Sequence, residues 1–348
     1  MGGYTREMRF PPVPKESRNQ IKKAGQTMID RNRSAQERAK AIELVDRFRA
    51  AHVYPINTFQ ITLGRKLKSF PNSFMAQRLK RLRSIMGKLR KERNMKVTTM
   101  QDIAGLRAVV NSVKDVYVLE RTYAKTKFEH IFKSAVDYIA KPRDSGYRGL
   151  HLIYYYRSKR KPEYDGLILE IQVRTKLQHS WATAVEITEL LVDQPLKASI
   201  GSKEWLDFFA IVSSAFACLE GKPTLAAHSH LPQRKIFERV KTEEALLNVR
   251  RTMKGLPLVA KYISQSSRAL EYHLVEQDFD KNVVRITSYA ATSLQEAVDA
   301  YAKAEAGLSG THKNVVLVSA ADLKKAYPNL YLDSREFIKN LEKVISLA

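Results

Sequence analysis

The spacing of apolar residues along the chain changes from a helical period to a strand period. Residues 16–52 have apolar positions at helical spacing and predict a helix that Pro55 ends. Residues 74–93 predict a second helix with basic outer faces. Its apolar stripe consists of Leu79, Leu82, Ile85 and Leu89. Residues 16–52 and 74–93 are therefore predicted to be helical.

Alternation of apolar and polar residues predicts strands in the next part of the chain. The predicted strands are residues 103–111, 135–139, 150–156 and 167–175. Residues 113–127 predict a helix between the first two strands, and a long helix is predicted over 177–191. We expect this centre to be α/β (α+β), a mixed β-sheet flanked by helices.

The last third of the chain has a different pattern. Residues 202–265 are mostly helical by spacing, and residues 270–277 and 283–289 predict a hairpin around 278–282. After the hairpin, Ser293 and Glu296 match a capping box for a helix that Gly307 ends. A short strand and a terminal helix follow, at residues 315–319 and 334–345. These elements predict a small C-terminal α/β domain.

Composition restricts the class of protein. The 348 residues are 44% hydrophobic and contain no apolar run long enough to cross a membrane. Cys218 is the only cysteine, which excludes an internal disulfide, and residues 1–15 lack an apolar signal core. We expect a globular cytoplasmic protein.

The net charge of +24 favours a partner that carries phosphates. Residues 61–100 hold 12 Lys and Arg but a single acidic residue, Glu92. Nucleotides and RNA fit this charge better than a membrane surface, because no stretch pairs the charge with a large apolar face. We therefore expect no membrane partner.

Residues 170–175 read Glu-Ile-Gln-Val-Arg-Thr. In a strand, Glu170, Gln172 and Arg174 project from one face and the apolar residues between them from the other. A carboxylate, an amide and a guanidinium in one row are suited to holding a metal and phosphates. Asp102 precedes another predicted strand, and with Glu170 it makes a carboxylate pair of the kind that binds Mg²⁺.

Two further segments carry side chains at a spacing that suits nucleotide binding. On the predicted helix, four polar residues can converge on a triphosphate: Arg78, Lys80, Ser84 and Lys88. An ordinary solvated basic helix is the alternative. Tyr147 opens a predicted strand and offers a flat face for a nucleobase, and His151 shares its alternation face. Core packing of Tyr147 and a structural role for His151 are the alternatives.

Together these segments resemble the synthetase domain of the RelA/SpoT family of alarmone synthetases. The family's Arg-x-Lys-x-x-x-Ser-x-x-x-Lys occurs at 78–88, and its Asp-Ile-Ala-Gly-x-Arg at 102–107. Its Gly-Tyr-x-x-x-His occurs at 146–151, and its Glu-Ile-Gln-x-Arg-Thr at 170–175. The four motifs stand in the family's order, and the resemblance covers about residues 60–190.

The resemblance implies a nucleotidyltransferase-like core that moves the β,γ-diphosphate of ATP to a ribose 3′-hydroxyl and releases AMP. Asp102 and Glu170 would be catalytic and hold Mg²⁺. The ATP-binding residues would be Arg78, Lys80, Ser84, Lys88 and Arg107. The acceptor-binding residues would be Lys141, Arg143, Tyr147, Arg148, His151, Gln172 and Arg174.

Departures from the family pattern fall near the acceptor motifs. Ser145 and Gly149 stand where many members have Asn and Ser, and Ile187 replaces a histidine. We therefore keep two acceptors open: GTP or GDP, which would give (p)ppGpp, and the 3′ end of tRNA. A non-catalytic RNA-binding protein is a third hypothesis. No His-Asp dipeptide of the family's hydrolase half occurs, so we predict synthesis without degradation.

The predicted domain boundaries follow from these segments. Residues 1–60 would be an N-terminal helical region and 61–200 the RelA/SpoT-like synthetase domain. Residues 201–265 would be a helical connector and 266–348 a small C-terminal α/β domain. An oligomer is compatible with this organisation.

Overall fold

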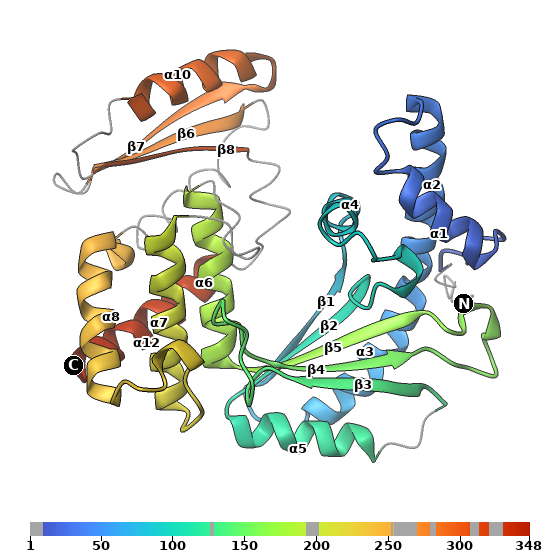
Figure 1. The fold of residues 1–348 in the computed structure, drawn as a ribbon, viewed down its shortest axis with the longest axis horizontal. Coiled ribbons are helices and arrows are strands. Elements are labelled where there is room, and N and C mark those ends of the chain that lie inside the picture. The colour runs from blue at the N-terminus through green and yellow to red at the C-terminus, as the bar shows by residue number, and fades with distance from the viewer. Residues whose placement is uncertain are drawn as a thin grey trace, which may run out of the picture. The chain divides into compact units, whose positions relative to one another are not determined.

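The computed structural model describes residues 10–125, 129–192, 202–251, 253, 270–278, 283–306, 313–319 and 330–348. The chain divides into two compact units, each of which is described by itself (Figure 1). Unit 1 comprises Met1–Tyr138 with Gly149–Lys176, and unit 2 comprises Ile139–Arg148 with Leu177–Ala348. The predicted regions 1–60 and 61–200 therefore do not coincide with the compact units, because residues 139–148 and everything from Leu177 onward group with the C-terminal part.

Unit 1 is built on a five-stranded sheet in the order β1-β2-β5-β4-β3. The strands are β1 (Phe74–Leu79), β2 (Ala104–Val110), β3 (Ile131–Asp137), β4 (Leu150–Tyr155) and β5 (Ile168–Thr175). β2 and β5 are parallel, whereas the other neighbouring pairs are antiparallel. The predicted mixed sheet flanked by helices is therefore confirmed.

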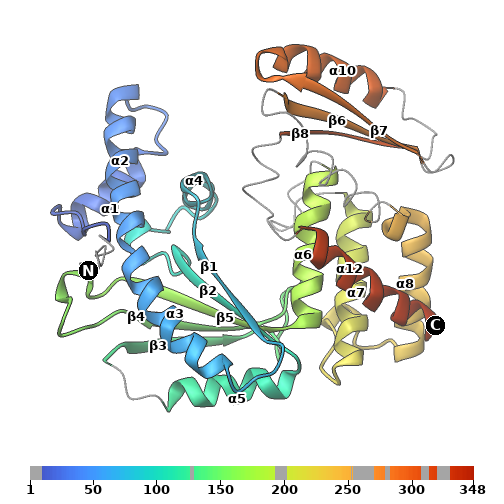
Figure 2. The same cartoon turned by 180° about the vertical axis from the view of Figure 1, so that it is seen from behind.

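The two faces of this sheet differ in what covers them. Helices α3 (Val53–Leu67) and α5 (Val113–Ala124) pack on one face, as Figures 1 and 2 show from opposite sides. Phe59 of α3 and Tyr123 of α5 both contact the ring of Tyr154 on β4. Because Tyr154 is opposed by Leu169 on β5, the apolar residues of β5 project toward these helices. The polar residues of β5 project from the opposite face.

The predicted helix over residues 16–52 is two helices, α1 (Arg18–Thr27) and α2 (Ala35–Ala51). Both begin at a capping box, Ser17 with Gln20 and Ser34 with Glu37, and the second box marks the break that apolar spacing did not reveal. Pro55 does not end this region as predicted. It lies in the first turn of α3, where a proline costs no intrahelical hydrogen bond.

The predicted basic helix over residues 74–93 is also wrong in its first half. Residues 74–79 form the edge strand β1, and only Leu82–Lys91 form a helix, α4. Pairing with β2 satisfies the backbone of β1, and the ladder continues with a hydrogen bond from Lys80 N to Ile103 O of 2.8 Å. Leu79 therefore belongs to the strand, and Ile85 and Leu89 are the buried residues of α4.

Unit 2 contains a helical core. Its main helices are α6 (Lys176–Val192), α7 (Lys203–Leu219), α8 (Gln233–Leu247) and α12 (Leu330–Ser346). The terminal helix was predicted to belong to the small α/β domain, but its apolar residues pack into this helical core. These residues are Phe337, Ile338, Leu341 and Val344. Their helical stripe complements α7 and α8, which adjacency in sequence could not indicate.

Unit 2 also contains a three-stranded antiparallel sheet in the order β7-β6-β8. Its strands are β6 (Leu270–Asp278), β7 (Val283–Ala290) and β8 (Lys313–Ser319), and α10 (Leu294–Ala306) packs against them. Residues 279–282 of the predicted turn at 278–282 lie outside the described residues, as does Gly307. The same is true of residues 252 and 254–265 of the predicted helical stretch 202–265.

Short 3₁₀ helices complete the described secondary structure. They are η1 (Val97–Thr99), η2 (Pro162–Tyr164), η4 (Ala226–His228) and η5 (Ala291–Ser293). Within the described ranges, no helix combines the length and the apolarity that crossing a membrane requires.

Candidate active site

Strand register gathers the predicted polar residues of unit 1 on one face of the sheet. Gln172 on β5 is opposed by Arg107 on β2 and by His151 on β4. Glu170 is opposed by Gly105, which in turn is opposed by Arg78 on β1. Directly opposed side chains lie on the same face. The face opposite α3 and α5 therefore carries Arg78, Arg107, His151, Glu170, Gln172 and Arg174.

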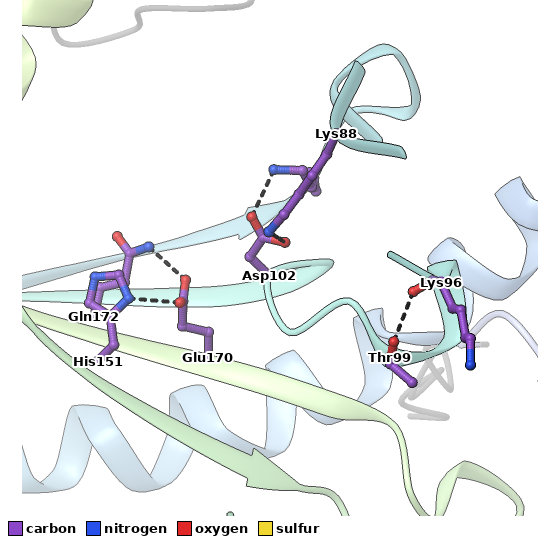
Figure 3. Close-up of polar contacts among 8 residues, drawn as sticks. Lys88, Lys96, Thr99, Asp102, His151, Glu170 and Gln172 are labelled. Carbon is purple, nitrogen blue, oxygen red and sulfur yellow. Dashed lines mark hydrogen bonds and ion pairs between the residues drawn. The ribbon is translucent and has the colours of Figure 1, made fainter. Parts of the chain in front are cut away.

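The polar row of β5 is a chain of hydrogen bonds that ends on Glu170. Arg174 Nη2 donates to Gln172 Oε1 at 2.9 Å, and Gln172 Nε2 donates to Glu170 Oε2 at 2.6 Å. From β4, His151 Nδ1 contacts Glu170 Oε1 at 2.8 Å (Figure 3). Each carboxylate oxygen of Glu170 thus has a hydrogen-bond partner on a strand, which fixes the orientation of the carboxylate.

Glu170 is buried, yet its carboxyl group favours the ionised form. Burial raises the pKa of Glu170 and the charge of Asp102 raises it further, but the bonds from His151 and Gln172 outweigh both, so the pKa lies below its usual value. Because an ionised carboxylate only accepts hydrogen bonds, His151 Nδ1 is the donor in this pair. The site therefore presents a fixed negative charge.

Asp102 lies just before β2 and is held by two cations. Lys80 Nζ contacts its Oδ2 at 2.8 Å, and Lys88 Nζ contacts its Oδ1 at 3.2 Å (Figure 3). Lys80 follows β1 and Lys88 lies on α4, so the strand-to-helix connection brings both lysines to one carboxylate. Burial raises the pKa of Asp102, but the two ammonium groups lower it by more, and the pKa falls below its usual value.

The other predicted ATP-binding residues lie on the same elements. Arg78 is exposed on β1 and Arg107 is half-buried on β2, and the two positions are two residues apart in the register. Ser84 lies one turn before Lys88 on α4. The N-cap residue of α4, Arg81, makes no side-chain capping bond to the first-turn amides. These N–H groups and the positive end of the helix dipole suit a phosphate group.

Asp102 and Glu170 fit a magnesium ion. Both are ionised by the direction of their pKa shifts, and the charge of Asp102 acts on Glu170. The described residues contain no cluster of three or more His, Cys, Asp or Glu side chains that would form a cage for a metal. Mg²⁺ is typically bound by one or two carboxylates plus substrate phosphates and water, so this donor set suits it.

A cleft of about 500 Å³ in unit 1 was not predicted from the sequence. The segment after α4 lines it together with Lys133 of β3, and the lining residues are Glu92, Arg93, Asn94, Met95, Thr99, Gln101 and Lys133. Arg93 belongs to the basic stretch that composition identified, but no signal in the sequence singled out Lys133.

Four predicted acceptor residues belong to unit 2, in the loop at Ile139–Arg148. Lys141 and Arg143 are exposed there. Tyr147 is half-buried and packs against the helical core, with the Arg143 guanidinium 5.8 Å from the centre of its ring.

Arg148 differs from the other residues of this loop because it is buried. Its side chain is 3% exposed, and its guanidinium donates to Ser213 Oγ at 3.1 Å and to Ile139 O at 3.3 Å. Burial lowers the pKa of Arg148 to about 10. These contacts make Arg148 an anchor of the loop in this structure, and we do not include it among the phosphate-binding residues proposed below.

Comparisons with known proteins indicate a family for part of the chain. The family model described as the region found in RelA / SpoT proteins matches residues 77–188. The GTP pyrophosphokinase YjbM of Bacillus subtilis is 35% identical over 116 residues, 32% of this chain and 54% of that protein. The GTP pyrophosphokinase YwaC of the same organism is 30% identical over 119 residues, 32% of this chain and 56% of that protein.

Among solved structures, the small alarmone synthetase 1 of Bacillus subtilis bound to its product pppGpp is similar at 26% identity and a TM-score of 0.44. The match covers 51% of this chain and 92% of that chain. The chain spans about half the length of the two curated relatives. The family model thus covers residues 77–188, which confirms the resemblance over that part of the chain, and the remainder of the chain lies outside the match.

Proposed function

We propose that this protein is a pyrophosphotransferase that moves the β,γ-diphosphate of ATP to the 3′-hydroxyl of GTP or GDP, with (p)ppGpp and AMP as products. The observation that carries the proposal is the hydrogen-bonded row on β5. It holds an ionised carboxylate, Glu170, on the same sheet face as three arginines, and a second carboxylate, paired with two lysines, lies before β2. The names of the curated relatives support the same reaction class.

Residues of unit 1 would have two roles in this reaction: some would bind the donor, ATP, and one would act as the base. Lys80 before α4, and Ser84 and Lys88 on α4, would bind the ATP phosphates, with Arg78 and Arg107 beside them. The acceptor 3′-oxygen would attack the β-phosphorus of ATP and form the new P–O bond. The bond from the β-phosphorus to the α,β-bridging oxygen would break, and AMP would leave with that oxygen.

Glu170 would accept the proton of the attacking hydroxyl. Its two hydrogen bonds leave lone pairs on both oxygens, since a carboxylate accepts about four hydrogen bonds. His151 and Gln172 would hold it in place during the transfer, so that positioning and charge supply the catalysis. A magnesium ion bound by Asp102 and Glu170 would neutralise charge on the transferred phosphates.

The acceptor is tested by offering several to the protein at once. ATP labelled on its γ-phosphate would be incubated with GDP, GTP and deacylated tRNA, and the products separated. We expect the label in the guanine nucleotides. Label in tRNA alone would contradict the nucleotide acceptor while leaving diphosphate transfer intact, and no label in any acceptor would contradict the function itself.

Exposed cations favour tRNA as the second candidate acceptor. The outer side of α4 and the residues around it present a set of exposed basic side chains: Arg81, Arg83, Arg90, Lys91, Arg93 and Lys96. Such a surface suits an RNA backbone, whose binding weakens as salt rises. A non-catalytic RNA-binding protein would share this surface but would form no labelled product.

A further inference from the structure

The loop that carries Tyr147 is pressed against helices α6 and α7 of unit 2. Gly146 has φ +92°, in the region that favours glycine. A Cβ atom at this position would come within 2.9 Å of Ser213 Cβ and 2.8 Å of Trp181 Cζ2. Trp181 is itself fixed, because its Nε1 donates to Phe209 O at 2.9 Å. The backbone at Gly146, next to Tyr147, is therefore closely packed and held in one conformation.

The hydroxyl group of Ser213 forms hydrogen bonds with both chain neighbours of Tyr147, Gly146 and Arg148. Ser213 Oγ donates to Gly146 O at 2.6 Å and accepts from Arg148 Nε at 3.1 Å. Ser213 and Arg148 are 2% and 3% exposed, so water does not compete for these bonds. The loop also closes on itself, with Gly146 N bonded to Arg143 O at 2.8 Å.

We propose that Ser213 is a positioning residue for the acceptor: it fixes the Gly146–Arg148 backbone so that Tyr147 presents its ring to the acceptor base. This inference rests on the proposed function and on the role expected for Tyr147 from the sequence, stacking on the acceptor base. Ser213 lies on α7, outside the RelA/SpoT match at 77–188, so a helix from outside that domain sets the geometry of one of its motifs. The ATP-binding residues proposed above belong to unit 1.

Removing the hydroxyl would loosen the loop. Gly146 O and Arg148 Nε would lose their shared partner, and the acceptor would then have to order the loop on binding. Loss of a buried hydrogen bond of this kind corresponds to about a five- to tenfold weaker interaction. We therefore expect Ser213→Ala to raise the KM for GDP about five- to tenfold and to leave the KM for ATP unchanged.

The next residue of α7 offers a matched control. Ser214 is also fully buried, but its hydroxyl contacts His228 Nδ1 at 2.8 Å and accepts from Leu225 N at 3.2 Å. Ser214→Ala therefore removes the same atom from the same helix and affects a different loop. We expect it to change the KM for GDP less than twofold.

A double variant separates positioning from general destabilisation. If Ser213 acts through the tyrosine ring, Ser213→Ala in a Tyr147→Ala background should not raise the KM for GDP further. Additive effects of the two substitutions would overturn the proposal. An equal rise in the KM for GDP from Ser213→Ala and Ser214→Ala would overturn it as well.

Amide hydrogen exchange gives a readout that does not depend on activity. Ser213→Ala should speed exchange at residues 143–148, whereas Ser214→Ala should speed it at 225–228. Unchanged exchange at 143–148 would overturn the proposal even in an active enzyme. If the wild type transfers label only to tRNA, the same KM comparison is made with tRNA. If it transfers none, the proposed function fails and the exchange data still decide whether Ser213 fixes the loop.

Discussion

Asp102 and Glu170 are two carboxylates of one candidate site, and they are held in different ways. The Asp102 side chain is 27% exposed and is paired with two lysines on flexible stems. The Glu170 side chain is 9% exposed and receives its hydrogen bonds from an imidazole and an amide on rigid strands. The first arrangement neutralises charge and can exchange partners with phosphates, and the second fixes geometry. In the proposed function, this difference would make ATP binding depend on electrostatics and the proposed base, Glu170, depend on its position.

The largest effect is expected from Glu170→Gln. The substitution keeps the size of the side chain but removes the base, which contributes about 10²–10⁴-fold in rate. Transfer of label from ATP should fall by this factor, while ATP affinity, measured by calorimetry without magnesium, should remain unchanged. Glu163→Gln, at a side chain that is 49% exposed, is the control and should keep full activity. Wild-type transfer by Glu170→Gln would refute the role of the base.

The donor region should respond to loss of a lysine. Lys80→Met and Lys88→Met should each weaken ATP binding by about 10- to 100-fold, since each removes a charged hydrogen bond. Lys80 should have the larger effect, because it is closer to Asp102 and only 13% exposed against 27% for Lys88. Affinity measured from 50 to 300 mM salt should fall in the wild type and fall less in each variant. Equal salt slopes would contradict the electrostatic account.

The positioning of Glu170 is tested through Gln172. Gln172→Leu removes the donor to Glu170 Oε2 and the link to Arg174, and we expect about a tenfold fall in kcat. ATP affinity should not change, which separates this variant from the lysine variants. Gln77→Leu, at an exposed glutamine of β1, is the control. A fall in ATP affinity with unchanged kcat would place Gln172 in the donor region instead.

Stability should fall in acid for both carboxylates. Because their folded-state pKa values lie below the unfolded values of 4.5 and 3.8, the unfolded state binds protons more readily. Their contribution is fully present above about pH 4.5 and is lost as pH falls through the lowered folded-state pKa values. Urea unfolding at a series of pH values should show this fall, with a shallower slope in Glu170→Gln and Asp102→Asn. Slopes equal to wild type would contradict the pKa directions.

The smallest effect is expected from Gly105→Ala. A Cβ atom there would meet only Arg78 O at 3.7 Å and Glu170 O at 3.9 Å, which are ordinary contacts. Alanine in a strand should raise the free energy of unfolding by about 0.5–1 kcal/mol. The added methyl group projects from the site face but meets only ordinary contacts, so we expect little change in the KM for ATP. A destabilised variant would show that the glycine serves the fold.

The sequence predicted strands β2, β4 and β5 of this site well, because the alternation of apolar and polar residues and the spacing of the motifs are local signals. It placed Glu170, Gln172 and Arg174 on one face, and the structure confirms this placement. The sequence placed Arg78 and Lys80 on a helix, because the apolar residues at 79–89 have helical spacing. In the structure, residues 74–79 instead pair with β2 as an edge strand. The spacing of apolar residues within a segment does not show whether that segment will pair with the edge of a sheet.

Contacts between residues far apart in the chain could not be predicted from the sequence. The two lysines on Asp102 depend on how the chain turns from β1 into α4. The Ser213 contacts join residues 65 and 67 positions apart, and nothing local to α7 distinguishes Ser213 from Ser214. The terminal helix α12 likewise packs with helices far from it in sequence.

The central claim is that ATP gives up its β- and γ-phosphates together. The most direct measurement follows ATP labelled at the α-phosphate and, in parallel, ATP labelled at the γ-phosphate, with GDP, GTP and tRNA present. The account predicts AMP from the first label and labelled acceptor from the second, in equal amounts. Formation of ADP, or of free phosphate without labelled acceptor, would contradict it.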